Sequence, residues 1–316
     1  MVGIEYWPYE LKSEAPLGRG GDRVFSGALL RRGGVDGGHA CLHPWPGLGD
    51  LPLDRQLQLL AAGGSSPLVE RALACLEIDA TARREGRHLL EEVPSKGNHW
   101  QWRPGRDPEV EAEQVRRHRI SIVKIKAGQG ADATAVIARI CSLLPEIAVR
   151  VDFNGRLEPE AALTWWQELP DSLRDKVEWV EDPTVPQADW LRLREAGMPL
   201  ALDIGWPEAA EGVPHDFAVI KPARTGALPE AGFPCVYTSY LDHPLGQCWA
   251  AYGAGLALNE CLPVARGGLA SHPMFEPNAF SEQIGIGPDG VLEAPTGTGL
   301  GFDELLADLS WIPLTS

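Results

Sequence analysis

Hydrophobic and polar positions in the first part of the chain predict short strands followed by two helices. Apolar runs alternate with Gly- and Pro-rich turns up to about residue 42, and helical spacing of apolar positions begins near residue 53. Strands grouped ahead of helices are typical of a small α+β unit, so we expect a first domain over residues 1–97. The expected strands are residues 4–11, 24–30 and 39–42, and the expected helices are residues 53–62 and 67–83.

From about residue 99 onwards, apolar strands alternate with helical stretches. Such alternation predicts parallel strands joined by right-handed crossovers. The strands are almost continuously apolar, which indicates burial on both faces, and their number favours a closed barrel over an open sheet. We therefore expect an α/β fold, a modified (β/α)7β TIM-type barrel over residues 98–301, with a tail at 302–316 that returns to the first domain. The expected strands are residues 120–126, 147–152, 177–181, 199–203, 217–221 and 235–239, and the first helices between them are residues 131–144 and 158–168.

Charged side chains stand where five of these strands end. In a barrel of this kind, the active-site groups lie at the C-terminal ends of the strands. The three acidic positions are each separated by about one strand–helix unit, so their carboxylates are expected to meet at one height. The segments SIVKIKAG, VRVDFNG, EWVEDP, ALDIG and AVIKP supply, in that order, Lys124 with Lys126, Asp152, Glu181, Asp203 and Lys221.

Three carboxylates that converge would resist ionisation unless a cation neutralises them. Ligands that are all oxygen favour Mg²⁺, with Mn²⁺ as a substitute, over zinc. Lys124 and Lys126 alternate along one strand and therefore point to the same inner face, whereas Lys221 comes from the far side. Repulsion among these ammonium groups and the metal lowers a lysine pKa, which suits a general base that removes a proton next to a metal-bound carboxylate.

Composition and charge narrow the classes of partner. The chain has 316 residues and a formal net charge of −16, which argues against nucleic acid or an anionic membrane as partner. No apolar run is long enough to span a membrane, and the N-terminus lacks the pattern of a signal peptide, so we expect a cytoplasmic protein. The six cysteines show no C-x-x-C pair and are expected to be free thiols. We expect a small-molecule carboxylate as substrate and make no prediction of the oligomeric state.

The strand-end motifs resemble those of the enolase superfamily, in its muconate-lactonising subgroup, with the o-succinylbenzoate synthase family as the nearest likeness. The motifs that carry the resemblance are KIKAG, VDFNG, WVEDP, LDIG and VIKPARTG. The resemblance implies that the first domain caps the barrel, that Lys126 is the base with Lys124 as its companion, and that Lys221 stabilises charge from the opposite face. It further implies that the metal ligands are Asp152, Glu181 and Asp203, and that Asn154, Thr238 and Ser239 contact substrate.

The reaction implied is the metal-dependent dehydration that forms 2-succinylbenzoate in menaquinone biosynthesis. N-succinylamino acid racemisation and muconate cycloisomerisation stay open, because they use the same lysines and metal. A non-catalytic barrel with a vestigial site is a further alternative, which the intact set of charged residues disfavours. The sequence departs from the family at Ile204, where an acid is usual, and in the TSYLDHPLG segment. Whether Tyr240, His243 and Arg224 touch substrate therefore stays open.

Overall fold

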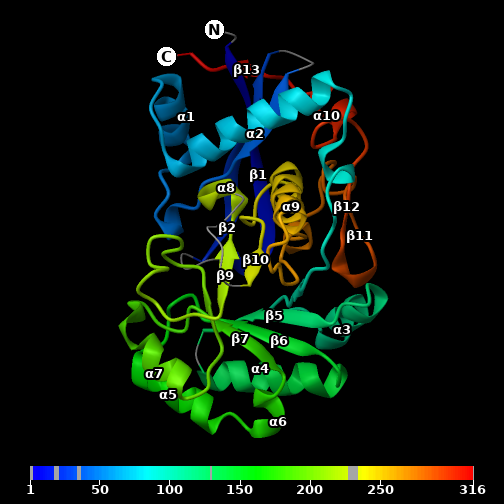
Figure 1. Ribbon diagram of the computed structural model, residues 1–316. Coiled ribbons are helices and arrows are strands. Elements are labelled where there is room, and N and C mark those ends of the chain that lie inside the picture. The colour runs from blue at the N-terminus through cyan, green and yellow to red at the C-terminus, as the bar shows by residue number, and fades with distance from the viewer. Residues whose placement is uncertain (1–2, 18–20, 34–36, 129, 227–233, 316) are drawn as a thin grey trace.

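An antiparallel sheet forms the N-terminal part of the fold (Figure 1). The protein is described by a computed structural model over residues 3–17, 21–33, 37–128, 130–226 and 234–315. The sheet has the order β13-β1-β2-β3, and the last strand of the chain pairs with the first through Glu5 opposite Pro313. The two chain ends consequently lie near each other at the top of Figure 1. Its strands are β1 (Ile4–Leu17), β2 (Asp22–Arg32), β3 (Gly38–Leu42) and β13 (Ile312–Pro313).

Two helices, α1 (Leu53–Ala61) and α2 (Pro67–Arg84), pack on this sheet. The backbone of α2 comes so close to β3 that a Cβ at Gly38 would lie 1.8 Å from the carbonyl oxygen of Leu76, which only glycine avoids. The buried carboxylate of Asp79 on α2 accepts hydrogen bonds from the backbone N–H groups of His39 and Leu300, both at 2.7 Å. This carboxylate therefore ties α2 both to β3 and to the C-terminal segment that leads into α10 (Asp303–Ala307).

A parallel sheet of seven strands forms the second part, in the order β10-β9-β8-β7-β6-β5-β4. Residues 264–268 close the sheet, because they form single β-bridges to β10 on one side and to Asn98, next to β4, on the other. The predicted modified barrel with an N-terminal cap is thus confirmed. The strands are β4 (Trp100–Gln101), β5 (Ile122–Lys126), β6 (Ala148–Asp152), β7 (Val177–Glu181), β8 (Leu200–Leu202), β9 (Phe217–Ile220) and β10 (Cys235–Tyr237).

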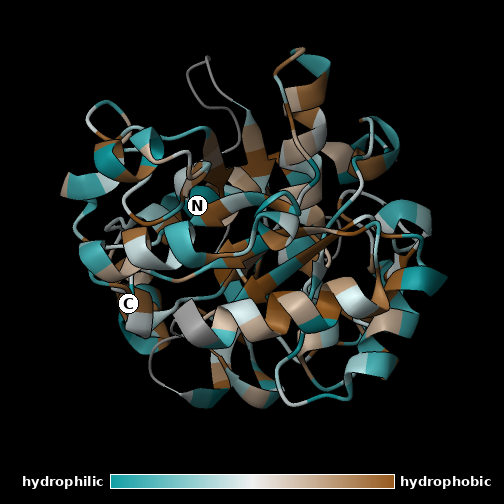
Figure 2. Cartoon of the chain, turned by 90° about the horizontal axis from the view of Figure 1, so that it is seen from below, coloured by the Kyte–Doolittle hydropathy of each residue, from teal (hydrophilic) through white to brown (hydrophobic). Residues whose placement is uncertain are grey.

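Helices surround the strands, and Figure 2 shows hydrophobic strands in the centre with helices of mixed hydrophobic and hydrophilic residues around them. Residues 203–216, all of them described, form turns rather than a helix between β8 and β9, as the short connection in the sequence indicates. Residues 227–233 of the next connection lie outside the described part of the chain. The helices are α3 (Pro108–Arg117), α4 (Gly130–Leu143), α5 (Pro159–Glu168), α6 (Asp171–Arg174), α7 (Trp190–Glu195), α8 (Pro222–Thr225) and α9 (Pro244–Asn259).

Several helices, among them α3 and α9, were not expected from the sequence. The residues of α9 are almost all apolar or small, and most are buried, because the helix lies between the cap and the barrel. A helix buried on all sides lacks the polar face that makes helical periodicity visible. The remaining short elements are β11 (Gly285–Ile286), β12 (Leu292–Glu293) and the 3₁₀ turns Pro46–Leu48, Leu89–Glu91, Gln187–Asp189, His272–Met274 and Pro288–Gly290.

The barrel interior is filled below the strand ends by an apolar layer that contains one buried cation. Trp179, Val219 and Val236 form part of this layer. Arg150, with no exposed surface, lies with its guanidinium carbon 3.7 Å from the centroid of the Trp179 ring. Arg150 and Asp152 alternate on β6 and face the same interior. The charged strand ends therefore stand on a closed floor that excludes water from below. Among the described residues, no helix is long and apolar enough to cross a membrane.

Candidate active site

A cavity of about 340 Å³ opens at the C-terminal ends of the barrel strands, beneath a loop of the cap. The catalytic, metal-binding and substrate-contacting residues predicted from the sequence all line it. They come from successive strands, and parallel strands bring their carboxyl ends to one edge, so their side chains meet there. The structure thus brings the predicted set together. These residues are Lys124, Lys126, Asp152, Asn154, Glu181, Asp203, Lys221, Thr238 and Ser239.

Lys124 joins two of the carboxylates. Its Nζ lies 2.7 Å from Oε1 of Glu181 and 3.0 Å from Oδ2 of Asp152, and all three side chains are less than a tenth exposed. Burial by itself would lower the pKa of Lys124, but the charges of Asp152 and Glu181 outweigh burial and raise it. Lys124 is therefore a permanent cation that neutralises these acids.

Lys126 is in a different electrostatic position. Its Nζ lies 3.9 Å from Oδ2 of Asp152, and its side chain is 28% exposed, toward the cavity. Burial of the ammonium lowers the pKa of Lys126, and the neighbouring charges of Lys124 and Lys221 lower it further against the opposite effect of Asp152. A lowered pKa brings the Lys126 amine closer to the range in which a lysine acts as a general base.

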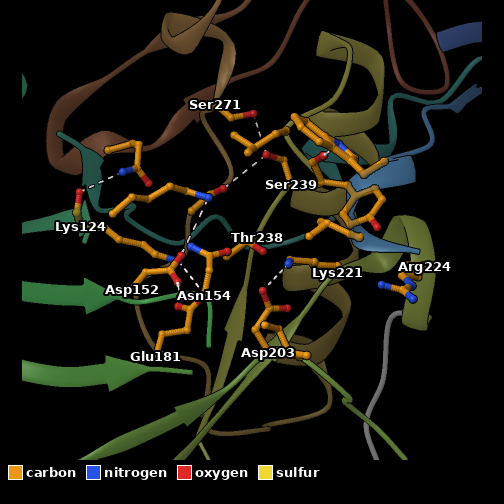
Figure 3. A pocket seen from close by; sticks show the side chains of 18 of the residues that line it. Lys124, Asp152, Asn154, Glu181, Asp203, Lys221, Arg224, Thr238, Ser239 and Ser271 are labelled. Carbon is orange, nitrogen blue, oxygen red and sulfur yellow. Dashed lines mark hydrogen bonds and ion pairs between the residues drawn. The ribbon is translucent and has the colours of Figure 1, made fainter. Parts of the chain in front are cut away.

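Lys221 approaches from the other side of the cavity, directly after β9 (Figure 3). Its Nζ forms an ion pair with Oδ2 of Asp203 and lies 5.6 Å from the centroid of the Tyr240 ring. Three strands, β6 to β8, separate β9 from β5 in the sheet, so Lys221 and Lys126 stand on different sides of the carboxylates.

One acidic residue was missed by the sequence reasoning. Asp182 follows Glu181 directly, and one oxygen from each of Glu181, Asp182 and Asp203 lies within 4.8 Å of the others. The carboxylate of Asp182 also accepts hydrogen bonds from the backbone N–H groups of Asp203 at 3.2 Å and Ile204 at 2.9 Å. Burial, and then the charges of Asp203 and Glu181, raise its pKa. The repeated acid in the EDP motif was the signal that could have identified it.

The donor set fits a hard divalent cation. The clustered ligand atoms are all carboxylate oxygens, and two lysine ammonium groups lie against them. Ammonium groups in that position show that the cluster requires positive charge. The three clustered acids do not include Asp152, whose Oδ2 faces Lys124 and Lys126.

Asn154 follows Asp152 in a turn that only a few residue types adopt. Its φ angle is 50°, in the left-handed region that Asn tolerates better than most residues, and its backbone N–H donates to Oδ1 of Asp152 at 3.0 Å. The turn therefore holds the orientation of Asp152 while the Asn154 side chain lines the cavity.

Hydroxyl groups and a glycine form one side of the cavity, next to the end of β10. We call this side the hydroxyl wall: Thr238, Ser239, Gly268 and Ser271. The hydroxyls of Ser239 and Ser271 lie 2.7 Å apart, and the buried Oγ1 of Thr238 has no hydrogen-bond partner among the described residues. Ser271 was not predicted, because it comes from a segment without regular structure.

The loop of the capping domain between β3 and α1, which we call the cap loop, closes the cavity through contacts with Tyr240. The indole N–H of Trp45 donates to the Tyr240 carbonyl oxygen at 2.7 Å, and the Tyr240 hydroxyl donates to Oδ2 of Asp50 at 2.8 Å. Arg224 also lines the cavity, with Nε 3.8 Å from Oδ1 of Asp50. His243 lies outside the lining and caps α9, since its Nδ1 accepts from the Leu245 N–H at 3.2 Å.

Solved structures of several enzymes share this fold at low sequence identity. Muconate lactonizing enzyme from Pseudomonas fluorescens, solved with muconolactone, is 18% identical with a TM-score of 0.74. The match covers 95% of this chain and 95% of the muconate lactonizing enzyme. A dipeptide epimerase from Enterococcus faecalis, solved with Mg and the dipeptide L-Leu-L-Tyr, is 18% identical with a TM-score of 0.73 and covers 95% of this chain and 99% of its own. This chain therefore has the capped-barrel fold of these two enzymes.

Sequence comparison narrows this class. Residues 4–82 match the family described as o-succinylbenzoate synthase, N-terminal domain, and residues 108–213 match the family described as enolase C-terminal domain-like. The o-succinylbenzoate synthase of Bdellovibrio bacteriovorus is 30% identical over 339 residues, covering 99% of this chain and 99% of the relative. The chain belongs to the o-succinylbenzoate synthase family, a family of dehydratases, that is, carbon–oxygen lyases. The predicted family and enzyme class are thereby confirmed.

Proposed function

We propose that this protein dehydrates 2-succinyl-6-hydroxy-2,4-cyclohexadiene-1-carboxylate to 2-succinylbenzoate in menaquinone biosynthesis. The observation that carries the proposal is the position of Lys126. It lines the same cavity as the clustered carboxylates, has a lowered pKa, and faces Lys221 across the barrel mouth. Identity of 30% along essentially the whole chain to an o-succinylbenzoate synthase supports the same reaction.

A divalent cation belongs to this proposal, and Mg²⁺ is the ion we expect, with Mn²⁺ as a substitute. Asp152, Glu181 and Asp203 would hold it, and Asp182 would fix the turn that carries Asp203 through its two hydrogen bonds. When bound, Mg²⁺ would attract the ring carboxylate and stabilise the negative charge that develops there. The dipeptide epimerase with the same fold was solved with Mg, which supports this choice of ion.

Proton transfer is assigned to Lys126. Its neutral amine takes the proton from the ring carbon that bears the carboxylate, and the resulting ammonium returns that proton to the hydroxyl that leaves. The carbon–oxygen bond breaks, water departs, and the ring becomes aromatic. One lysine can perform both transfers if both take place on one face of the ring. Lys221 and Lys124, which form ion pairs with Asp203 and Glu181, stabilise the charge on the substrate carboxylate.

Substrate orientation is assigned to residues around the metal cluster. Asn154 stands beside Asp152, while Thr238 and Ser239 belong to the hydroxyl wall and are suited to hydrogen-bond the oxygens of the succinyl chain. The Thr238 hydroxyl, which has no hydrogen-bond partner among the described residues, supports this assignment. A buried polar group without a partner destabilises the folded protein unless the substrate supplies a hydrogen bond.

The test is a dehydration assay that follows loss of the ultraviolet absorbance of the diene. We expect turnover with Mg²⁺, loss of turnover after chelation, and recovery when Mg²⁺ or Mn²⁺ is returned. Lys12→Ala, at an exposed position of β1, is a control that should keep full activity. A protein that binds no divalent metal and converts no carboxylate substrate would instead have a vestigial site.

N-succinylamino acid racemisation is the second candidate. The observation that favours it is the placement of Lys126 and Lys221 on different sides of one cavity, since two opposed bases can exchange a proton on both faces of a carbon. Incubation of N-succinyl amino acids in D₂O tests it: deuterium incorporated into both enantiomers would demonstrate racemase activity. Incorporation into neither, beside rapid dehydration of the diene, would restrict the enzyme to the synthase reaction.

Two further parts of the proposal concern the whole chain. We assign residues 1–97, with the tail at 302–316, to the capping domain and residues 98–301 to the barrel, a division that the pairing of β13 with β1 supports. We also place the protein in the cytoplasm, which its six free cysteines support.

A further inference from the structure

His99 is a cavity residue to which the proposed chemistry assigns no role. It precedes β4 on the first barrel strand, lines the cavity, and is 9% exposed. Its ring belongs to the same side of the site as the hydroxyl wall. A Cβ at Gly268 would lie 2.6 Å from Cε1 of His99 and 3.1 Å from Cγ2 of Thr238, so both side chains border this one glycine.

The protonation of the His99 ring follows from its partner. Arg150 Nη1 lies 2.8 Å from Nδ1 of His99, and a guanidinium can only donate, so Nδ1 must carry the lone pair. Burial, and then the charges of Arg150 and Lys124, hold the pKa of His99 well below its usual value, so the ring is neutral. The proton of the neutral ring is therefore on Nε2.

Arg150 is itself held firmly, so this assignment does not depend on a mobile group. Its Nη1 also donates to the carbonyl oxygen of Arg266 at 2.8 Å, and its Nε donates to Oε2 of Glu178 at 2.8 Å. The guanidinium is stacked on Trp179 in the barrel floor. The floor of the barrel thus fixes which nitrogen of His99 is a donor.

The donor nitrogen of His99 is left available for a ligand. Among the described residues, Nε2 has no hydrogen-bond acceptor, whereas Nδ1 has Arg150. A Cβ at Gly268 would lie 2.7 Å from Nε2, so glycine at this position allows the His99 ring to stand against the backbone here. A fixed, uncharged N–H group that faces a cavity suits an oxygen acceptor of a bound ligand.

We infer that His99 is a substrate-binding residue that donates its Nε2–H to an oxygen of the succinyl chain, with Arg150 as the residue that positions it. This inference rests on the proposed dehydration, because that reaction supplies a succinyl substrate. Both the ketone and the terminal carboxylate of the chain are acceptors. The ring carboxylate is excluded, since it is drawn to the metal cluster and its lysines.

Calorimetric binding to the Mg²⁺-loaded protein tests the inference without turnover. The ligands are 2-succinylbenzoate, 2-butanoylbenzoate, which lacks the terminal carboxylate, 2-(3-carboxypropyl)benzoate, which lacks the ketone, and benzoate. His99→Phe should weaken 2-succinylbenzoate about ten- to a hundredfold, the cost of an unpaired hydrogen-bond partner, and leave benzoate unchanged. The analogue that lacks the contacted oxygen should lose no affinity in the variant, which identifies the acceptor.

Two further variants protect the test against misfolding. His99→Gln keeps a side-chain N–H donor and should recover part of the affinity. Gly268→Ala would displace the His99 ring from its position and should weaken binding of 2-succinylbenzoate but not of benzoate. His118→Phe, at a histidine outside the cavity that stacks on Trp100, is the matched control and should bind as wild type does. Mg²⁺ affinity and Tm verify the integrity of each variant.

If His99→Phe weakens the binding of all four ligands equally, or weakens the binding of none of them, the inference is overturned. The proposed function still stands in that case, provided that the wild-type protein dehydrates the diene. A wild-type protein that neither binds 2-succinylbenzoate nor dehydrates the diene overturns the proposed function and the inference together.

Discussion

The ammonium nitrogen of Lys124 lies 2.7 Å from Oε1 of Glu181, in a part of the site that water barely reaches. The same nitrogen lies 3.0 Å from Oδ2 of Asp152. One buried cation thus holds two carboxylates that are both proposed metal ligands. Lys124 supplies positive charge to these two acids, and a metal held by Asp152 and Glu181 would supply positive charge to the same pair.

Replacement of Lys124 by Met should make the protein depend on metal for its stability. The variant leaves two buried carboxylates without their cation, at a cost of about 3–5 kcal/mol in the free energy of unfolding. A divalent ion can replace the lost charge, so MgCl₂ should raise the Tm of Lys124→Met more than that of wild type. Thermal unfolding with chelator and with MgCl₂ measures this. Equal shifts in the two proteins would show that Lys124 and the metal do not share ligands.

The identity of the third metal ligand can be decided between Asp152 and Asp182. If Asp152 binds the metal, Asp152→Asn should weaken Mg²⁺ binding about ten- to a hundredfold. Asp182→Asn should act mainly on stability, because it disturbs the hydrogen bonds to the turn after β8. Titration calorimetry with Mg²⁺ separates the two. A larger loss in Asp182→Asn would replace Asp152 by Asp182 in the proposed triad.

The buried carboxyl of Asp242 should make stability depend on pH near neutrality. Burial raises the pKa of Asp242 to about 7, whereas an unfolded Asp titrates near pH 3.9. Between about pH 4 and pH 7, Asp242 is therefore protonated in the folded state and ionised in the unfolded state. Its contribution to the free energy of unfolding falls as pH rises through this range and is constant above about pH 7.

Asp242→Asn removes this titration and should be more stable than wild type at pH 8, by on the order of 2–4 kcal/mol, with a smaller gain at pH 5. Urea unfolding at both pH values measures the difference. Asp308→Asn, at an exposed position, serves as the control and should keep the pH dependence of wild-type stability. Parallel stability curves for wild type and Asp242→Asn would contradict the assignment.

The contact between Tyr240 and the cap loop should affect substrate binding more than chemistry. Tyr240→Phe removes the hydrogen bond to Asp50 and loosens the loop that carries Trp45 over the cavity. We expect KM to rise about three- to tenfold, for a lost bond of roughly 1 kcal/mol, while kcat stays within about twofold. Steady-state kinetics beside Tyr252→Phe, on α9 outside the cavity, provide the comparison. An unchanged KM would mean that the loop is held without Tyr240.

The fold and the charged site were predictable from the sequence for one physical reason. Buried parallel strands are continuously apolar, so a charged residue at the end of each one is conspicuous, and strand–helix spacing sets its height. Lys126 and Asp152 were found in this way and pair in register across β5 and β6.

Other features depend on contacts that no local pattern encodes. Trp45 meets Tyr240 across 195 positions of sequence, and His99 meets Arg150 across 51. The strand β4 has two residues, which is too short for a periodicity, and α9 has no polar face. Asp182 was overlooked because an acid next to a predicted ligand is also a common turn residue, and only the tertiary structure shows which oxygens converge.

The most direct test of the account compares kcat for dehydration by wild type and Lys126→Ala at saturating Mg²⁺. We predict a fall of about 10²–10⁴-fold, the usual contribution of a general base, with Mg²⁺ affinity and Tm close to those of wild type. Lys126→Ala with full activity under these conditions would contradict the central claim that Lys126 carries the proton.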